Sequence, residues 1–360
     1  MPRDSNQPVH LLIRSRILEV LRDGELAAGD KLPAEPEWAD QLGVSRMTLN
    51  KVLVSLVQDG WLERVKGKGT FVADRGAETK LKIGIVIAED LQGAINNYYF
   101  GSLYFGLVGG AAEHGCQTDL IRLQNLVQDP SLADGFDGLV VINPPQPYVR
   151  ALAELGASGH PMVLLGSTWP GTEFSCIDSD NVLAAAMAVQ HLTEMGHRRI
   201  DFIGACPNDA NSIDRLRGYT TAMGICPGAE TFVHPWSADA TELSAEAKDS
   251  IRARLGENNP PTALVVGGPI IALQICHLAG SGGRSIPEGA SLVTFDDPGF
   301  LAASPVALST VVQPFTEMVK RAMDEITRLC ENPLATPRAA LCRPELIVRK
   351  STAAPRPHSH

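Results

Sequence analysis

The chain has 360 residues, 44% of them hydrophobic and 20% charged, and a formal net charge of −10. This length exceeds one compact core and predicts two or three domains, while the negative charge excludes a general binder of nucleic acid. No apolar leader and no apolar run near about 18 residues is present, which predicts a cytoplasmic protein that does not span a membrane. The seven scattered cysteines, never spaced C-x-x-C, favour reduced, buried thiols over a disulfide framework or a zinc site.

Charge is distributed unevenly along the chain. Residues 1–75 hold eleven Lys or Arg and eleven Asp or Glu, so the whole negative excess lies after residue 75. Within residues 41–75 there are six basic and three acidic side chains. Residues 41–75 therefore have a local excess of three positive charges, which favours a nucleic-acid contact there.

The first part of the chain predicts a winged helix-turn-helix domain at residues 8–73. Apolar residues at helical spacing predict three helices, which span 10–24, 34–43 and 45–59. Gly43 ends the second helix, and Ser45 is a good N-cap for the third. The segments WLERV and TFVA then alternate around the turn KGKG, which is typical of a β-hairpin.

The rest of the chain predicts a parallel α/β architecture. Residues 74–80 are polar and without periodicity, which indicates a linker, and the tail 352–360 is expected to be disordered. Between them, continuous apolar strands such as LKIGIVIA, DGLVVINPP, RRIDFIGA and ASLVTFDD alternate with helical patterns. Strands that are apolar on both faces belong to parallel sheets covered by helices. Because residues 81–351 are too many for one doubly wound sheet, two lobes are predicted.

The third helix carries the residue types of a DNA-recognition helix. Its first turns hold short polar and basic groups, while Leu49, Val52, Leu53 and Leu56 supply a packing face. Arginine can bind guanine through two hydrogen bonds, and asparagine can bind adenine in the same way. An ordinary amphipathic helix with a polar first turn is the alternative interpretation.

The turn after this helix supports the interpretation as a DNA reader. Arg64, Lys66 and Lys68 stand beside two glycines, so the backbone can approach a phosphate strand or a minor groove. A basic turn that is merely solvated is the alternative interpretation. The position of the turn directly after the third helix favours a contact with DNA. No sequence-specific contact is predicted for these lysines.

Residues 11–73 resemble the GntR-type winged-helix domain, through the segment GDKLPAEPEWADQLGVSRMTLNKVLVSLVQDGWLERVKGKGTFV. The resemblance places Ser45, Arg46, Met47 and Asn50 on DNA-contacting positions of the helix, and Lys66 and Gly67 at the tip of the wing. With their polar neighbours, the candidate DNA-binding residues are Ser45, Arg46, Met47, Thr48, Asn50, Lys51, Lys66, Gly67 and Lys68. The family usually has a basic residue where this chain has Pro36, so one phosphate contact is expected to be missing.

Residues 81–351 resemble a second family, the effector domains of LacI-type regulators, which are similar to bilobed periplasmic binding proteins. The resemblance rests on segments that occur in the family's order: DGLVVINPP, CIDSDNVLAAAMAVQHLTEMGHRRIDFIGA, DRLRGYTTAM, IPEGASLVTFDD, VVQPFTEM and RPELIVRKS. It implies two parallel doubly wound sheets. A GntR-type winged helix joined to such a domain is the arrangement of arabinose-type repressors.

The second resemblance also implies a set of effector-binding residues. Tyr99 and Phe100 fall where the family has pocket aromatics, and Arg215 falls where it has an arginine that binds ligand hydroxyls or a carboxylate. Trp236 matches an aromatic that stacks on a sugar or base, and Asp296 matches an acidic acceptor. An aromatic face covering C–H surface while Arg and Asp pair with polar groups is sound ligand chemistry. For Tyr99 and Phe100 a core role, and for Arg215 a structural ion pair, are the alternatives.

Three departures from the second family narrow the expected ligand. Gly166 stands where an acidic residue is common, and Gly268 and Pro269 stand where an Asn-Asp pair is frequent. Polar contacts of a usual hexose pocket are therefore missing. We expect a smaller sugar, a sugar acid or a nucleoside-like metabolite.

Enzyme motifs are not found in the sequence. It has no G-x-S-x-G elbow, no phosphate-binding P-loop and no H-E-x-x-H helix, and the pair Asp296–Asp297 has no accompanying nucleophile. His191 and His197 are too isolated to predict a metal site. We therefore predict a ligand-responsive transcriptional repressor without cofactor or metal, which binds double-stranded operator DNA as a homodimer. The alternative is a small-molecule binding protein or hydrolase with an N-terminal interaction module.

Overall fold

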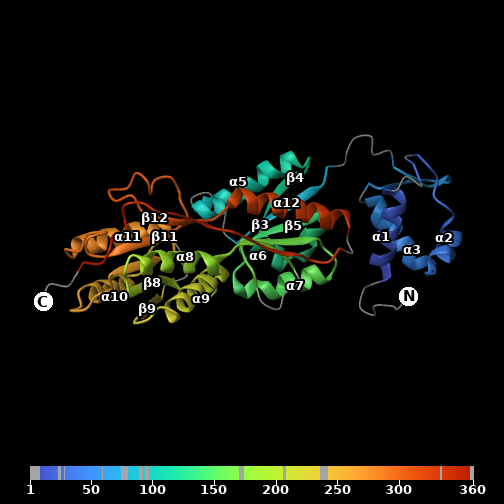
Figure 1. The fold of residues 1–360 in the computed structure, drawn as a ribbon. Coiled ribbons are helices and arrows are strands. Elements are labelled where there is room, and N and C mark those ends of the chain that lie inside the picture. The colour runs from blue at the N-terminus through green and yellow to red at the C-terminus, as the bar shows by residue number, and fades with distance from the viewer. Residues whose placement is uncertain are drawn as a thin grey trace.

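The computed structural model describes residues 9–22, 26–27, 29–58, 60–73, 80–88, 92–93, 97–169, 174–205, 208–235, 242–332 and 335–356. These residues form a small N-terminal domain and two α/β lobes (Figure 1). Trp236 and most of the predicted linker lie outside the described residues. The predicted fold class is confirmed.

The N-terminal domain contains three helices and a hairpin, as the sequence predicted. They are α1 (Val9–Arg22), α2 (Glu35–Leu42), α3 (Arg46–Gln58), β1 (Leu62–Val65) and β2 (Gly69–Val72). The two strands are antiparallel, with Val65 opposite Gly69, and Lys31 forms a further bridge to Phe71 beside β2. Gly43 ends α2 in the left-handed conformation, with φ 68°.

The packing face predicted for α3 is the core of this domain. Leu49, Val52, Leu53 and Leu56 are all buried, together with Ile17 of α1. Burying such a side chain stabilises a fold by about 1.5–3 kcal/mol. This burial fixes the rotation of α3 and leaves its polar side on the surface.

The first lobe is a six-stranded parallel sheet with the order β13-β7-β6-β5-β3-β4. Its strands are β3 (Lys82–Ile87), β4 (Gln117–Arg122), β5 (Gly138–Ile142), β6 (Met162–Leu165), β7 (Ser175–Ser179) and β13 (Ala339–Cys342). The helices α5 (Tyr98–Glu113) and α12 (Phe315–Glu331) cover one face of the sheet (Figure 1). The other face is covered by α6 (Leu123–Gln128) and α7 (Val149–Ala157).

The second lobe has the same build, with the strand order β14-β12-β11-β10-β8-β9. Its strands are β8 (Arg199–Ala205), β9 (Glu230–Pro235), β10 (Ala263–Val266), β11 (Ser291–Phe295), β12 (Ser309–Val312) and β14 (Glu345–Ile347), of which β14 is antiparallel. On one face lie α8 (Asn181–Glu194) and α9 (Ala210–Gly224). On the other lie α10 (Ala245–Leu255) and α11 (Pro269–Ser281).

The chain passes between the lobes three times: from β7 to α8, from β12 to α12, and from β13 to β14. Each lobe is therefore assembled from separate parts of the sequence. Ligands of open parallel sheets bind beyond the carboxyl ends of the strands. The three crossings begin at the carboxyl ends of β7, β12 and β13, which belong to both sheets. The carboxyl ends of the two sheets therefore meet where the lobes join.

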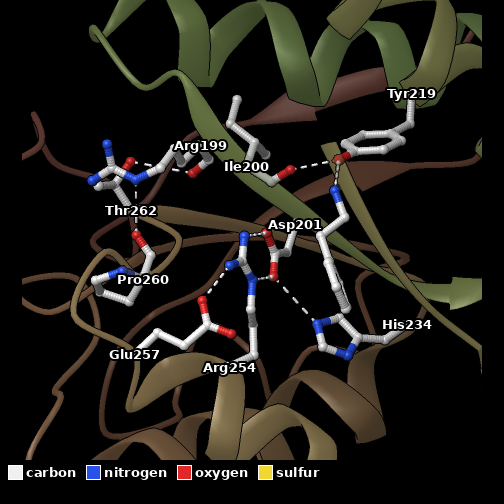
Figure 2. Close-up of polar contacts among 10 residues, drawn as sticks. Arg199, Ile200, Asp201, Tyr219, His234, Arg254, Glu257, Pro260 and Thr262 are labelled. Atoms are coloured by element: carbon white, nitrogen blue, oxygen red, sulfur yellow. Dashed lines mark hydrogen bonds and ion pairs between the residues drawn. The ribbon is translucent and has the colours of Figure 1, made fainter. Parts of the chain in front are cut away.

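The edge strand β9 is fastened by a buried ionic cluster in the second lobe (Figure 2). Arg254 donates from Nε to Oδ2 of Asp201 at 3.0 Å, and His234 Nε2 lies 3.2 Å from the same oxygen. Arg254 also lies over the ring of Phe232, 4.9 Å from its centroid. Asp201 is near the amino end of β8, whereas His234 is near the carboxyl end of β9, so the cluster connects these two strands with α10.

Residues 352 and 353, which were predicted to belong to a disordered tail, are hydrogen-bonded to the second lobe. His191 Nε2 lies 3.0 Å from Thr352 Oγ1, and His197 Nε2 lies 2.9 Å from the carbonyl oxygen of Ala353. The N–H of Ala353 donates to Ser291 Oγ at 2.9 Å. The boundary at residue 351 was therefore wrong, because the two histidines, isolated in sequence, hold this segment against the second lobe.

None of the helices among the described residues is long and apolar enough to cross a membrane. No group of three or more His, Cys, Asp or Glu among them is placed to hold a metal ion. The six cysteines within these ranges are free, and Cys116, Cys176 and Cys342 are buried.

Candidate functional site

The polar side of α3 is presented to solvent. Ser45 caps the helix, with its Oγ accepting from the N–H of Thr48 at 3.1 Å, and the two hydroxyls lie 2.8 Å apart. Arg46, Asn50 and Lys51 are exposed, and Met47 is 83% exposed. These are the types of side chain that read base edges, with an apolar group available for a thymine methyl.

The wing is an exposed basic turn between β1 and β2. Lys66, Gly67 and Lys68 form it, and all three are exposed. The N–H of Lys68 donates to the carbonyl of Val65 at 3.0 Å, and Gly67 has φ 77°, a conformation that favours glycine. The two lysines therefore point from a tight turn, as phosphate contacts require.

Arg64, which the sequence groups with the lysines of this basic turn, is directed away from the turn and contacts two helices. Its Nη2 donates to Oδ1 of Asn50 at 2.7 Å and to Oε1 of Glu35 at 2.7 Å. The guanidinium is thus directed at the start of α2 and at the recognition helix. Pro36 follows Glu35 as an exposed residue in the first turn of α2.

A second set of polar residues gathers where the two lobes meet. Asn143 follows β5, Ser167 follows β6, Ser179 ends β7 and Gln313 follows β12. Each has a buried side-chain oxygen without a hydrogen-bond partner among the described residues, and they supply four of the five such atoms there. Buried polar groups are nearly always satisfied, so these oxygens indicate where a polar ligand or water binds.

Tyr99 joins the two lobes at this place. Its hydroxyl donates to the carbonyl of Gly166 at 2.9 Å and accepts from Nδ2 of Asn211, on α9 of the second lobe, at 3.1 Å. Burial, followed by the charge of Asp178, raises the pKa of Tyr99 well above its ordinary value. The hydroxyl therefore stays protonated and remains a donor.

The same hydroxyl explains why residue 166 is glycine. Gly166 has φ 79°, and a Cβ on it would lie 1.9 Å from the Tyr99 oxygen. Any side chain here would be strained and would displace Tyr99. The structure thus puts a tyrosine hydroxyl at the position where the related family commonly has an acidic side chain.

Arg215 is buried, at 7% exposure, and is held by uncharged partners. Its Nε donates to Oδ1 of Asn181 at 2.9 Å and its Nη1 to the carbonyl of Gly267 at 3.0 Å, while Cζ lies 4.3 Å from the Phe295 ring centroid. Asn181 in turn donates to Oδ1 of Asn211 at 3.0 Å. A hydrogen-bonded chain therefore runs from Arg215 to Tyr99, and the alternative of a structural ion pair is not seen among the described residues.

Two buried carboxyl groups face Arg215. Asp296 is 5% exposed, has φ 65° and accepts from Nε2 of Gln313 at 2.7 Å. Burial raises the pKa of Asp296, against the opposing effect of Arg215. Burial also raises the pKa of Asp178 to about 8, against the N–H of Ser179 and Arg215. Perturbed carboxyls of this kind are concentrated at functional sites.

The predicted effector residues are thus only partly brought together. Tyr99, Arg215 and Asp296 meet at the junction of the lobes, and Phe100 packs against Tyr99 edge to face with ring centroids 5.4 Å apart. Trp236 lies outside the described residues. Four residues at this junction were not predicted from the sequence: Asp178, Asn181, Asn211 and Gln313. The CIDSDN segment was a signal for the first two, and the position after a strand was a signal for Gln313.

Comparison with known proteins assigns the two parts of the chain. Residues 12–72 match the gntR family of bacterial regulatory proteins, and residues 189–352 match a periplasmic binding protein-like domain. The arabinose metabolism transcriptional repressor of Geobacillus stearothermophilus is 27% identical, covering 97% of this chain and 99% of its own length. The repressor CytR of Escherichia coli K12 is 25% identical, covering 86% of this chain and 89% of its own.

Solved structures agree with this assignment at the level of the fold. A putative LacI transcriptional regulator from Bacillus cereus has a TM-score of 0.67 and 21% identity, over 77% of this chain and 100% of its own. The lac repressor dimer bound to operator and an anti-inducer has a TM-score of 0.65 and 18% identity, over 79% of this chain and 100% of its own. Residues 12–72 are thus similar to the gntR family of bacterial regulatory proteins, and the part of the chain that follows them is similar to periplasmic binding protein-like domains.

Proposed function

We propose that this chain is a transcriptional repressor whose binding to operator DNA is controlled by a small polar metabolite. The observation that carries the proposal is the exposed side of α3, where Arg46, Met47 and Asn50 stand beside the lysine-tipped wing. Relatives that align with nearly the whole chain and are named as repressors support it.

The junction of the lobes supplies the control. Tyr99 and Asn211 join the lobes at 3.1 Å, and Asn143 donates to Asp209 across them at 3.0 Å. A ligand that binds one separation of the lobes more tightly shifts the population toward it. In a homodimer, which we propose as the active form, such a shift changes the distance between two winged helices, so only one state fits the two half-sites of an operator.

Operator binding tests the proposal directly. Replacing Arg46 with alanine is expected to cost about 1–3 kcal/mol on the operator, because a base-reading contact is lost. Lys66→Ala should weaken all duplexes about equally and reduce the salt dependence by about one charge. The measurement is titration of an operator, selected from random duplexes with the purified protein, and of a scrambled duplex over a range of salt.

Sedimentation accompanies the titration, and the complex should contain two chains per operator. Unchanged operator affinity in both Arg46→Ala and Asn50→Ala would remove α3 as the recognition helix. A parent protein without sequence-specific affinity would favour the alternative, a binding protein or hydrolase with an N-terminal interaction module.

The charges at the junction favour an effector without negative charge. One guanidinium, Arg215, faces two carboxyl groups, Asp178 and Asp296. Where either carboxyl group is ionised, its charge offsets that of Arg215, so an anionic ligand would find no uncompensated cation there. Of the three ligand classes expected from the sequence, this supports the small sugar and the nucleoside over the sugar acid.

A matched pair of ligands tests this choice. A neutral pentose is expected to raise the melting temperature, whereas the aldonic acid of the same pentose should not. Ligand at about a hundred times its dissociation constant adds about 2.7 kcal/mol of stability, which a thermal scan detects readily. Stronger stabilisation by the acid would contradict the charge argument, and a nucleoside panel in the same scan covers the second class.

A further inference from the structure

Arg64 connects three elements of the DNA-binding domain through a single nitrogen. It lies on β1, and its Nη2 donates to Asn50 on α3 and to Glu35 at the start of α2, each at 2.7 Å. Both hydrogens of that nitrogen are thereby used. The result is a fixed link between the wing and the recognition helix.

This link does little for stability. The side chains of Arg64 and Glu35 are 41% and 39% exposed, and ion pairs with such exposure contribute almost nothing to folding. The two acceptors nevertheless hold the planar guanidinium in one orientation. The consequence of the contact is therefore geometric, and it falls on Asn50.

The orientation of the Asn50 amide follows from the chemistry of its partner. A guanidinium has only donors, so the amide atom that faces Arg64 must be the acceptor oxygen. With Oδ1 turned toward Arg64, Nδ2 and its two hydrogens point away from the wing. Asn50 thus presents donors, and its oxygen is already bound to a charged group.

Base recognition depends on this orientation. A free asparagine prefers adenine because its oxygen accepts from N6 while its nitrogen donates to N7. Guanine offers two acceptors, N7 and O6, in the same groove. We propose that Arg64 is a positioning residue that holds Asn50 as a donor, so that the base read by Asn50 is guanine rather than adenine. This inference rests on the proposed operator binding.

Selection of binding sites from random duplexes tests the proposal. The parent protein is expected to select guanine at the position that Asn50→Ala makes indifferent. Arg64→Met frees the amide oxygen, so preference there should move toward adenine by about tenfold, the effect of one bidentate contact. Glu35→Gln should shift it in the same direction but less, and Glu63→Gln, an exposed neighbour on β1, should not shift it at all.

The double variant separates positioning from direct contact. Adding Arg64→Met to Asn50→Ala should leave the base preference of Asn50→Ala unchanged. If Arg64→Met lowers the affinity for all sequences equally and guanine or adenine preference stays as in the parent, Arg64 is a phosphate contact and the proposal is overturned. If the parent selects no sequence at all, the proposed operator binding fails instead.

Discussion

Replacing Arg215 with methionine is expected to weaken effector binding by at least about a hundredfold. The guanidinium is buried, donates to Asn181, and its charge acts on Asp178 and Asp296. A hydrogen bond from a buried charged donor to a ligand is worth about 1.5–3 kcal/mol, and its loss also leaves the ligand's acceptor without a partner. Methionine keeps the apolar contact with Phe295 but supplies no donor, so both the ligand contact and the chain toward Tyr99 are lost.

Calorimetric titration of effector measures the loss, and a neighbour on the same helix provides the matched control. Arg217 also lies on α9, but its side chain is 64% exposed and paired with Asp214, so Arg217→Met should bind effector like the parent. Arg215→Met should keep its effector-free operator affinity, which shows that the DNA-binding domain is intact. Parent-like effector binding in Arg215→Met would place the ligand elsewhere.

The DNA-binding domain was largely predictable because its signals are local. Ser45 as a cap, Gly43 as a stop and the leucine stripe of α3 are separated by a few residues only, and each has the predicted role. The contacts of Arg64 were not predicted, because its partners, Glu35 and Asn50, are 29 and 14 residues away. Nothing in periodicity or turn chemistry specifies such a contact.

The effector site was less predictable because its residues come from both lobes, between which the chain passes three times. Asp178 and Asn181 flank the passage from β7 to α8, and they meet Asn211 and Tyr99 only once two sheets have formed. Gly166 was interpreted as a lost contact, whereas its left-handed backbone leaves the space that the Tyr99 hydroxyl fills. The Tyr99 hydroxyl thus occupies the space that a side chain at residue 166 would fill. The role of Trp236 remains a prediction.

The contribution of Asp178 to the stability of the protein should fall as the pH rises from about 4 to about 8. Burial raises the pKa of this carboxyl to about 8 in the folded chain, whereas the ordinary value is 3.8. Between these values the folded state keeps a proton that the unfolded state has lost. Each pH unit in that interval therefore lowers the free energy of unfolding by about 1.4 kcal/mol at most, and the effect ends above pH 8, where both states are ionised.

Unfolding by urea at pH 5, 6, 7 and 8 measures this contribution when the parent is compared with Asp178→Asn. The amide cannot ionise, so the variant should gain stability relative to the parent with every unit of pH. Asp119→Asn is the control for the same substitution at the surface, because the Asp119 side chain is 58% exposed. An apolar or amide side chain at residue 178 would make the protein more stable, so we infer that the buried carboxyl group is needed for effector binding. If the curves of parent and Asp178→Asn run parallel from pH 5 to 8, Asp178 is ionised throughout that range and the prediction is contradicted.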